Sequence, residues 1–120
     1  MKIIIVRTSN LILDFKTYNC QELGLAKALS RRGYEMSIIT PDIKASHRQE
    51  DVEGGLPIDI YTVTFCALNR NICWHHGVDE LLKQISPDLI HINSISLSMS
   101  YYYQLWAEKN KVKTVVIQGN

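Results

Sequence analysis

Neutral polar side chains stand beside two apolar runs of the sequence, where they could bind hydroxyl groups. Asn10 follows the run "KIIIV", and Asn93 closes the run "DLIHIN", which also contains His91. Asn19 precedes a helical pattern, whose first backbone amides would add further donors. Amide groups donate and accept hydrogen bonds without net charge, which suits sugar hydroxyls or phosphate oxygens. Taken singly, each Asn also fits ordinary turn or cap chemistry.

The side chain of His91 has a second interpretation besides a binding role. His91 alternates with Ile90 and Ile92, and strands of a parallel sheet are buried on both faces. The sequence therefore favours a histidine that packs beneath a helix over one that binds a ligand, although both interpretations stay open.

The stretch "CWHH" at residues 73–76 raises the question of a metal site. Its ligands are crowded into one turn and cannot easily surround a tetrahedral ion, and no matching second cluster exists. We interpret it as a loop entering a helix and predict no metal site. The three cysteines lack CxxC spacing, which argues against a disulfide framework and for a reducing compartment.

Length and composition predict one soluble globular domain. The chain has 120 residues, 46% of them hydrophobic and 21% charged, with a formal net charge of +1. That charge lacks the strongly basic character of a nucleic-acid partner. No apolar run approaches the ~20 residues of a membrane span, and no signal peptide is recognisable. We expect a cytoplasmic chain, although a complete enzyme could still work at the inner face of a membrane.

Periodicity predicts five strands and three helices. The strands fall at 2–7, 34–40, 58–65, 88–93 and 113–119, and residues 41–57 read as loop. A first helix begins near Tyr18 and stops at Gly33, and a second covers 78–85 before Ser86-Pro87. A third helix covers 94–110, with its apolar face at Leu97, Tyr101 and Leu105.

This alternation predicts an α/β fold with a Rossmann-like parallel sheet and helices on both faces. Right-handed crossovers give the strand order 3-2-1-4-5. Ligands of such sheets bind at the carboxyl ends of strands, where the order reverses. Strands one, four and five are neighbours in this order, so we expect Asn10, Asn93 and Gln118 to converge on one crevice, with the helix amides near Asn19.

Three stretches in order resemble a known family: "QELGLAKALSRRGYEMSIIT", "PDLIHINS" and "VKTVVIQGN". Together they are similar to the N-terminal domain of family-4 glycosyltransferases, which have the two-domain GT-B fold, and to a subgroup making bacterial surface polysaccharides. The resemblance implies that residues 1–120 form the acceptor-side domain, itself incomplete, and that the C-terminal donor-binding domain is absent. It implies a sugar or lipid-linked glycan acceptor, and a nucleotide-sugar donor and retaining transfer in the complete enzyme.

The departures from the family pattern limit what is carried over. Residues 15–20 replace the Gly-Gly pair that precedes the first helix in many relatives, and Asn93 replaces the second histidine of "HxH". The family histidine near the reaction centre corresponds to Gln118, which cannot act as a general base but can position a hydroxyl. The Glu-x7-Glu pair of the second domain does not occur. We therefore assign no catalytic residue, and the resemblance implies acceptor contacts at Asn10, Asn19, His91, Asn93 and Gln118.

Two other interpretations of the chain remain. One is a small flavodoxin-like domain that binds a nucleotide or phosphate on its first loop, although the glycine expected in such a loop is missing. The other is an inactive truncated gene product. We expect the isolated chain to transfer no sugar, and its last strand to leave an open sheet edge.

Overall fold

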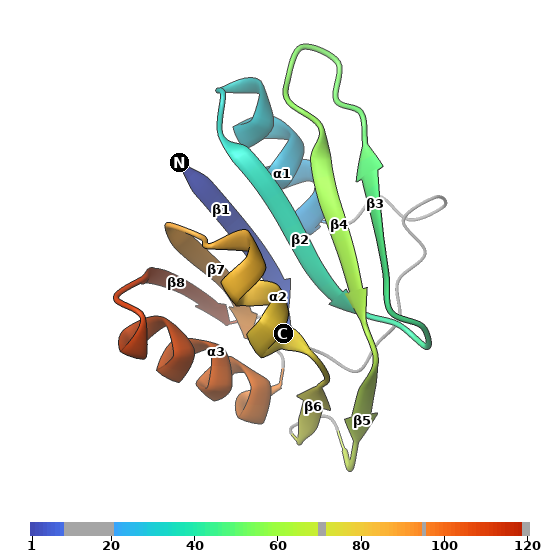
Figure 1. Ribbon diagram of the computed structural model, residues 1–120, viewed down its shortest axis with the longest axis vertical. Helices are drawn as coiled ribbons and strands as arrows, with labels where there is room; N and C mark the ends of the chain where they lie inside the picture. Colours follow the sequence, from blue (N-terminus) through green and yellow to red (C-terminus); the bar gives the residue numbers. More distant parts are fainter. Residues whose placement is uncertain (9–20, 70–71, 95, 119–120) are drawn as a thin grey trace.

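The computed structural model describes residues 1–8, 21–69, 72–94 and 96–118. Within these ranges it contains a six-stranded sheet, a two-stranded hairpin and three helices (Figure 1). In chain order the elements are β1 (Lys2–Arg7), α1 (Gln21–Arg31), β2 (Glu35–Pro41), β3 (Ser46–Glu50), β4 (Ile58–Val63), β5 (Phe65–Ala67), β6 (Cys73–His75), α2 (Val78–Ile85), β7 (Leu89–Ser94), α3 (Leu97–Lys109) and β8 (Lys113–Gln118).

The large sheet has the order β3-β4-β2-β1-β7-β8. Its strands β4, β2, β1, β7 and β8 pair in parallel, which confirms the predicted order of five strands. The sixth strand, β3, was not predicted and lies antiparallel against β4 at the outer edge. A Rossmann-like sheet with β1 at its centre is the result.

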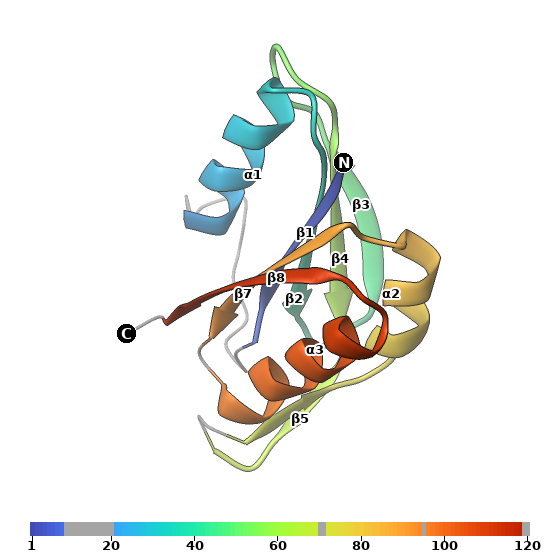
Figure 2. The ribbon, with the colours of Figure 1, turned by 90° about the vertical axis from the view of Figure 1, so that its left-hand side faces the viewer.

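Helices cover both faces of this sheet, as predicted (Figures 1 and 2). In β1, Ile3 and Ile5 belong to the core beneath α1, whereas Ile4 and Val6 belong to the core beneath α2 and α3. This alternation follows from the two-residue period of a strand, and a continuous apolar run is needed because both faces are buried. The run "KIIIV" is therefore the sequence signal of the central strand.

The helix ends also follow the predicted signals. α1 stops at Arg31, and Gly33 adopts a φ of 93°, a left-handed conformation that glycine reaches without steric cost. α2 stops at Ile85, before Ser86, whose amide donates to the carbonyl of Leu82. Proline at position 87 cannot donate such a bond, and it restrains the residue before it.

Three local predictions were wrong. Residues 46–50 form β3, although they were predicted as loop, because β4 offers them an unpaired edge. The predicted strand 58–65 ends at Val63, and the chain then pairs with Cys73–His75 as the β5–β6 hairpin. That pairing makes most of "CWHH" a strand and not a loop.

The predicted apolar face of the third helix was also wrong. Met99, Tyr103 and Ala107 are the buried residues of α3, whereas Tyr101 and Leu105 are exposed by 63% and 46%. The buried face also contains the small residue Ser100, which allows the helix to approach β7 closely.

Among the described residues, no helix combines the length and the apolar character that a membrane crossing requires.

Candidate functional site

The carboxyl edge of the sheet brings the ends of β1 and β7 together. Arg7 and Asn93 are register partners on these strands. The Thr8 hydroxyl donates to the backbone carbonyl of Asn93 over 2.9 Å and accepts from the amide of Ser96 over 3.1 Å. Thr8 therefore fastens the end of β1 to the chain that follows β7. The strand order reverses between these two strands, which is where open parallel sheets bind their ligands.

A buried carboxylate stands at this edge. Glu22, in the first turn of α1, is 5% exposed, and its Oε1 accepts from Arg7 Nη1 over 2.8 Å and from the Asn93 amide. Burial would raise the pKa of Glu22, but its backbone hydrogen bond, the Arg7 charge and these two side-chain bonds together lower it. The carboxylate is therefore ionised at neutral pH and is balanced by Arg7.

This network fixes the orientation of the Asn93 side chain. Its Nδ2 group donates to Glu22, a carboxylate that can only accept. The amide therefore cannot flip without losing that bond, and its carbonyl oxygen is turned away from Glu22. Because the backbone of Asn93 is held by Thr8 as well, the side chain is positioned in advance as a hydrogen-bond acceptor.

A hollow of about 560 Å³ opens beside this network, between α1 and the strands β7 and β8. We call it the α1–β7 hollow. Its polar lining consists of Gln21, Glu22, His91 and Asn93, and its apolar lining of Leu25, Leu29 and Ile117. Gly24 also lines it and presents no side chain. The hollow therefore offers a mainly apolar wall with a polar group of side chains at one end, an arrangement typical of small-molecule sites.

His91 contributes an imidazole to the hollow. It is half-buried, and its Nδ1 atom has no hydrogen-bond partner within the described part of the chain. Burial lowers the pKa of His91 and outweighs the opposing effects of its backbone hydrogen bond and of Glu22. The ring is therefore neutral near pH 7, when one imidazole nitrogen can accept a proton or a hydrogen bond.

The predicted site residues have different outcomes. His91 and Asn93 point to the same side of β7 and line the same hollow. Asn10 and Asn19 lie outside the described residues, as does the side chain of Gln118. The backbone of Gln118 pairs with Ser94 at the end of β8, next to the end of β7. The ring of His91 is half-buried and borders the hollow, and its role in binding a ligand stays a prediction.

Sequence reasoning missed Arg7, Glu22 and Gly24. A signal for Glu22 was present, because it lies four residues before Ala26 and so on the buried stripe of the helix. A carboxylate on a buried stripe requires a partner of opposite charge. Arg7, which ends an otherwise apolar strand, was the nearest basic residue that the predicted sheet could place there.

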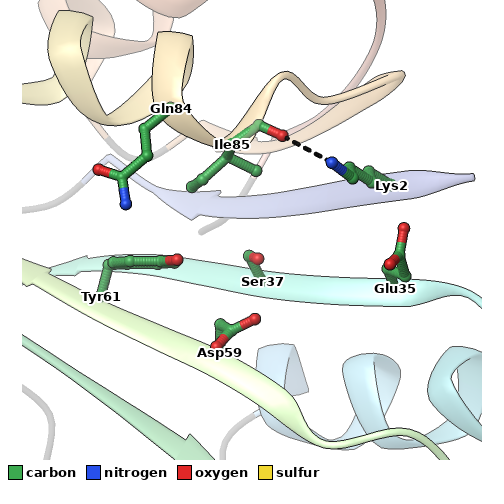
Figure 3. Close-up of a pocket in the computed structure, with 7 residues that line it drawn as sticks. All are labelled: Lys2, Glu35, Ser37, Asp59, Tyr61, Gln84 and Ile85. Atoms are coloured by element: carbon green, nitrogen blue, oxygen red, sulfur yellow. Dashed lines mark hydrogen bonds between the residues drawn. The ribbon is translucent and has the colours of Figure 1, made fainter.

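A second hollow, of about 260 Å³, lies toward the amino ends of β1 and β2 (Figure 3). Two of its charged groups, Lys2 and Asp59, already have partners within the chain. Lys2 Nζ donates to the carbonyl of Ile85 over 3.4 Å, and Asp59 Oδ1 accepts from His47 over 2.8 Å. Because parallel sheets bind ligands at the opposite ends of their strands, the α1–β7 hollow is the better candidate site.

The described residues contain no group of three or more His, Cys, Asp and Glu side chains that could hold a metal ion. Cys73 is buried in β6, where its backbone amide donates to Ser98 Oγ over 2.9 Å. Burial raises the pKa of the Cys73 thiol, and nearby Cys66 adds to that effect, so the thiolate needed for metal binding is disfavoured.

Comparison with known proteins gave one family. The family model described as Glycosyltransferase Family 4 matches residues 23–117, which include most of α1, all of β7 and most of β8. The searches of curated proteins and of solved structures gave no match.

Proposed function

Since the chain belongs to glycosyltransferase family 4, we propose that it is the acceptor-binding half of an enzyme that transfers a sugar from a nucleotide-sugar donor. The observation that carries this proposal is the α1–β7 hollow, which lies beside the positioned Asn93 amide at the carboxyl edge of the sheet. The Rossmann-like sheet of the chain is consistent with one half of a GT-B fold.

The acceptor would use both walls of the hollow. Its hydroxyl groups would form hydrogen bonds with Asn93 and His91. From the resemblance to the family, we propose the same role for Asn10, Asn19 and Gln118. The apolar wall of Leu25, Leu29 and Ile117 suits the apolar part of a lipid-linked glycan. A phosphate at the polar end is less favourable, because the positive charge of Arg7 is already paired with Glu22. For this reason we prefer an acceptor hydroxyl to the phosphate of a flavodoxin-like domain.

The chain's contribution to transfer is to hold and orient. Asn93 is fixed by Glu22 and Thr8 before the acceptor arrives, so little ordering is needed on binding. The neutral imidazole of His91 can accept a hydrogen bond from an acceptor hydroxyl. A second domain would supply the donor site and, by closing, exclude water. We propose that the complete enzyme acts in the synthesis of a bacterial surface polysaccharide or glycoconjugate, at the inner face of the membrane.

The test is sugar transfer by the complete enzyme that carries this domain, with Asn93→Ala against wild type. We expect transfer to fall roughly threefold to tenfold, the scale of one hydrogen bond to a neutral hydroxyl. Asn110→Ala is the matched control, because Asn110 also makes a side-chain hydrogen bond, to the Trp106 carbonyl, but at the end of α3. Unchanged transfer in Asn93→Ala would overturn the assignment of this edge to the acceptor.

A further inference from the structure

The second hollow, of about 260 Å³, lies on the face of the sheet that also carries α2 (Figure 3). We call it the β2–β4 hollow. In β2 and β4, Ile38 and Ile60 belong to the core beneath α1. Side chains alternate along a strand, so Ser37, Asp59 and Tyr61 point to the other face. Figure 1 shows this face, on which α2 lies over β1 and β7 and no helix of the described chain crosses β2 or β4.

Ser37 presents a nearly buried hydroxyl to this hollow. The residue is 7% exposed and lines the hollow, and its Oγ atom makes no hydrogen bond within the described part of the chain. A polar group in such a place costs free energy unless it finds a hydrogen-bond partner. Water or a ligand hydroxyl must supply that partner.

Tyr61 adds an aromatic ring that is held in place. One face of the ring stacks on His47, with centroids 4.3 Å apart and planes 7° from parallel, and His47 is itself bonded to Asp59 over 2.8 Å. The other face is turned toward the hollow, below Gln84 (Figure 3). A fixed aromatic face suits the C–H groups of a sugar ring, and the hydroxyl of tyrosine adds a polar contact. Burial and, to a lesser degree, Asp59 raise the pKa of Tyr61, so this hydroxyl stays protonated and can donate.

The remaining polar groups offer both donors and acceptors. Lys2 Nζ donates to one backbone carbonyl of α2 and keeps two further N–H donors. Asp59 Oδ1 accepts from two side chains of β3, whereas its Oδ2 atom has no partner among the described residues. Glu35 and Gln84 line the hollow as exposed side chains. Two carboxylates disfavour an anion and the Lys2 ammonium disfavours a cation, so a neutral molecule rich in hydroxyl groups fits best.

A further hollow, of about 450 Å³, adjoins the β2–β4 hollow, and Tyr61 and Gln84 line both. The two follow β4 from Asp59 to Val63, which is roughly 13 Å at about 3.3 Å per residue. That length exceeds one sugar ring. The groove is therefore suited to several linked sugar units.

We propose that the β2–β4 hollow and its neighbour bind a neutral oligosaccharide at a site separate from the acceptor hollow. The α1–β7 hollow lies on the other face of the sheet and at the other ends of the strands, and the six residues of β1 between them span about 20 Å. The inference rests on the proposed function for its purpose, since the site would hold a glycan chain between transfers. Glycan binding itself requires neither a donor nor a second domain.

The first experiment is an NMR titration of the ¹⁵N-labelled full chain with cellotetraose, maltotetraose and chitotetraose. We expect at least one of these neutral tetrasaccharides to give saturable shifts centred on the amides of Ser37, Asp59, Tyr61 and Gln84. No shift with any of them would overturn the proposal. Shifts centred on His91 and Asn93 would overturn it as well, but they would support the proposed function, so the two proposals fail separately.

The second experiment compares variants for affinity and melting temperature. Ser37→Ala should bind the tetrasaccharide roughly threefold to tenfold more weakly, the scale of one hydrogen bond to a neutral hydroxyl. Its melting temperature should not fall, because the lost hydroxyl has no partner in the chain. Ser100→Ala is the matched control, since Ser100 is also buried, at 3% exposed, but lies on α3 outside both hollows.

Tyr61→Leu tests the aromatic face and should weaken binding at least as much as Ser37→Ala, because the stacked ring is lost. Neither variant alters the lining of the α1–β7 hollow, so transfer to a short acceptor should stay at the wild-type rate. Wild-type affinity for the tetrasaccharide in both variants would overturn the proposal.

Discussion

Enlarging Gly24 should block the α1–β7 hollow without weakening the fold. Gly24 lies in α1 and lines the hollow, and a Cβ atom added there meets no atom within 4 Å. Glycine inside a helix costs about 0.5–1 kcal/mol relative to alanine. Gly24→Ala should therefore be more stable by about that amount, which raises the melting temperature by roughly 2–4 °C.

Gly24→Leu should keep most of this gain, since leucine is also a good helix former. Its side chain, however, would extend into the space proposed for the acceptor. If it displaces about two CH₂ groups of the acceptor from the apolar wall, the loss is about 1.6 kcal/mol. That loss corresponds to roughly a tenfold rise in the KM for the acceptor.

The assay is initial-rate transfer by the complete enzyme, with the acceptor concentration varied and the donor saturating, beside thermal melting curves. Ala28→Leu is the control, because Ala28 lies on the same helix but is exposed and does not line the hollow. An acceptor KM in Gly24→Leu equal to that of Ala28→Leu would refute the placement of the acceptor. A fall in stability in Gly24→Ala would refute the packing argument itself.

Two further predictions concern stability alone. Glu22→Gln should cost roughly 3 kcal/mol at pH 7, because it leaves the Arg7 charge buried without its partner. The pKa of Glu22 is lowered on folding, so its contribution is present above the ordinary value of 4.5 and is lost as the pH falls through the folded value; denaturant unfolding at several pH values should show the gap between wild type and variant closing in acid, and a constant gap would contradict this. Gly55→Ala should destabilise by about 1–3 kcal/mol, because its Cβ would lie 2.6 Å from Ser30 Oγ and 2.9 Å from the Arg31 amide nitrogen. A melting temperature equal to that of the wild type would disprove that clash, and Gly24→Ala provides the same substitution in open space.

The parallel part of the sheet could be predicted because its signal is simple. Ile3, Ile4 and Ile5 must be buried on both faces, and such a run can lie only inside a covered sheet. β3 carries no such signal, since most of its side chains are exposed. Its pairing depends on contacts with β4, where His47 stacks on Tyr61 with ring centroids 4.3 Å apart and bonds to Asp59. Contacts between two strands cannot be read from the periodicity of one.

The face of α3 illustrates a different limit. The set Leu97, Tyr101 and Leu105 has the same four-residue spacing as Met99, Tyr103 and Ala107. A helix that is apolar on several sides gives no preferred direction by periodicity, so packing decides. Only part of the candidate site could be predicted from the sequence, for a related reason. Asn93 and His91 follow from strand ends, but Glu22 becomes meaningful only once Arg7 is known to lie beside it.

The central position of β1 also has a consequence for synthesis of the chain. The register partners of Ile4 are Ser37 in β2 on one side and Ile90 in β7 on the other, so its second neighbour is made much later. A ribosome adds about 5–20 residues per second, which puts roughly 4–17 seconds between the two strands. During that interval the nascent chain carries an apolar strand with one unpaired edge. The yield of folded protein in the cell should therefore depend on chaperones that bind extended apolar segments. Faster translation of the residues between β1 and β7 should reduce that dependence.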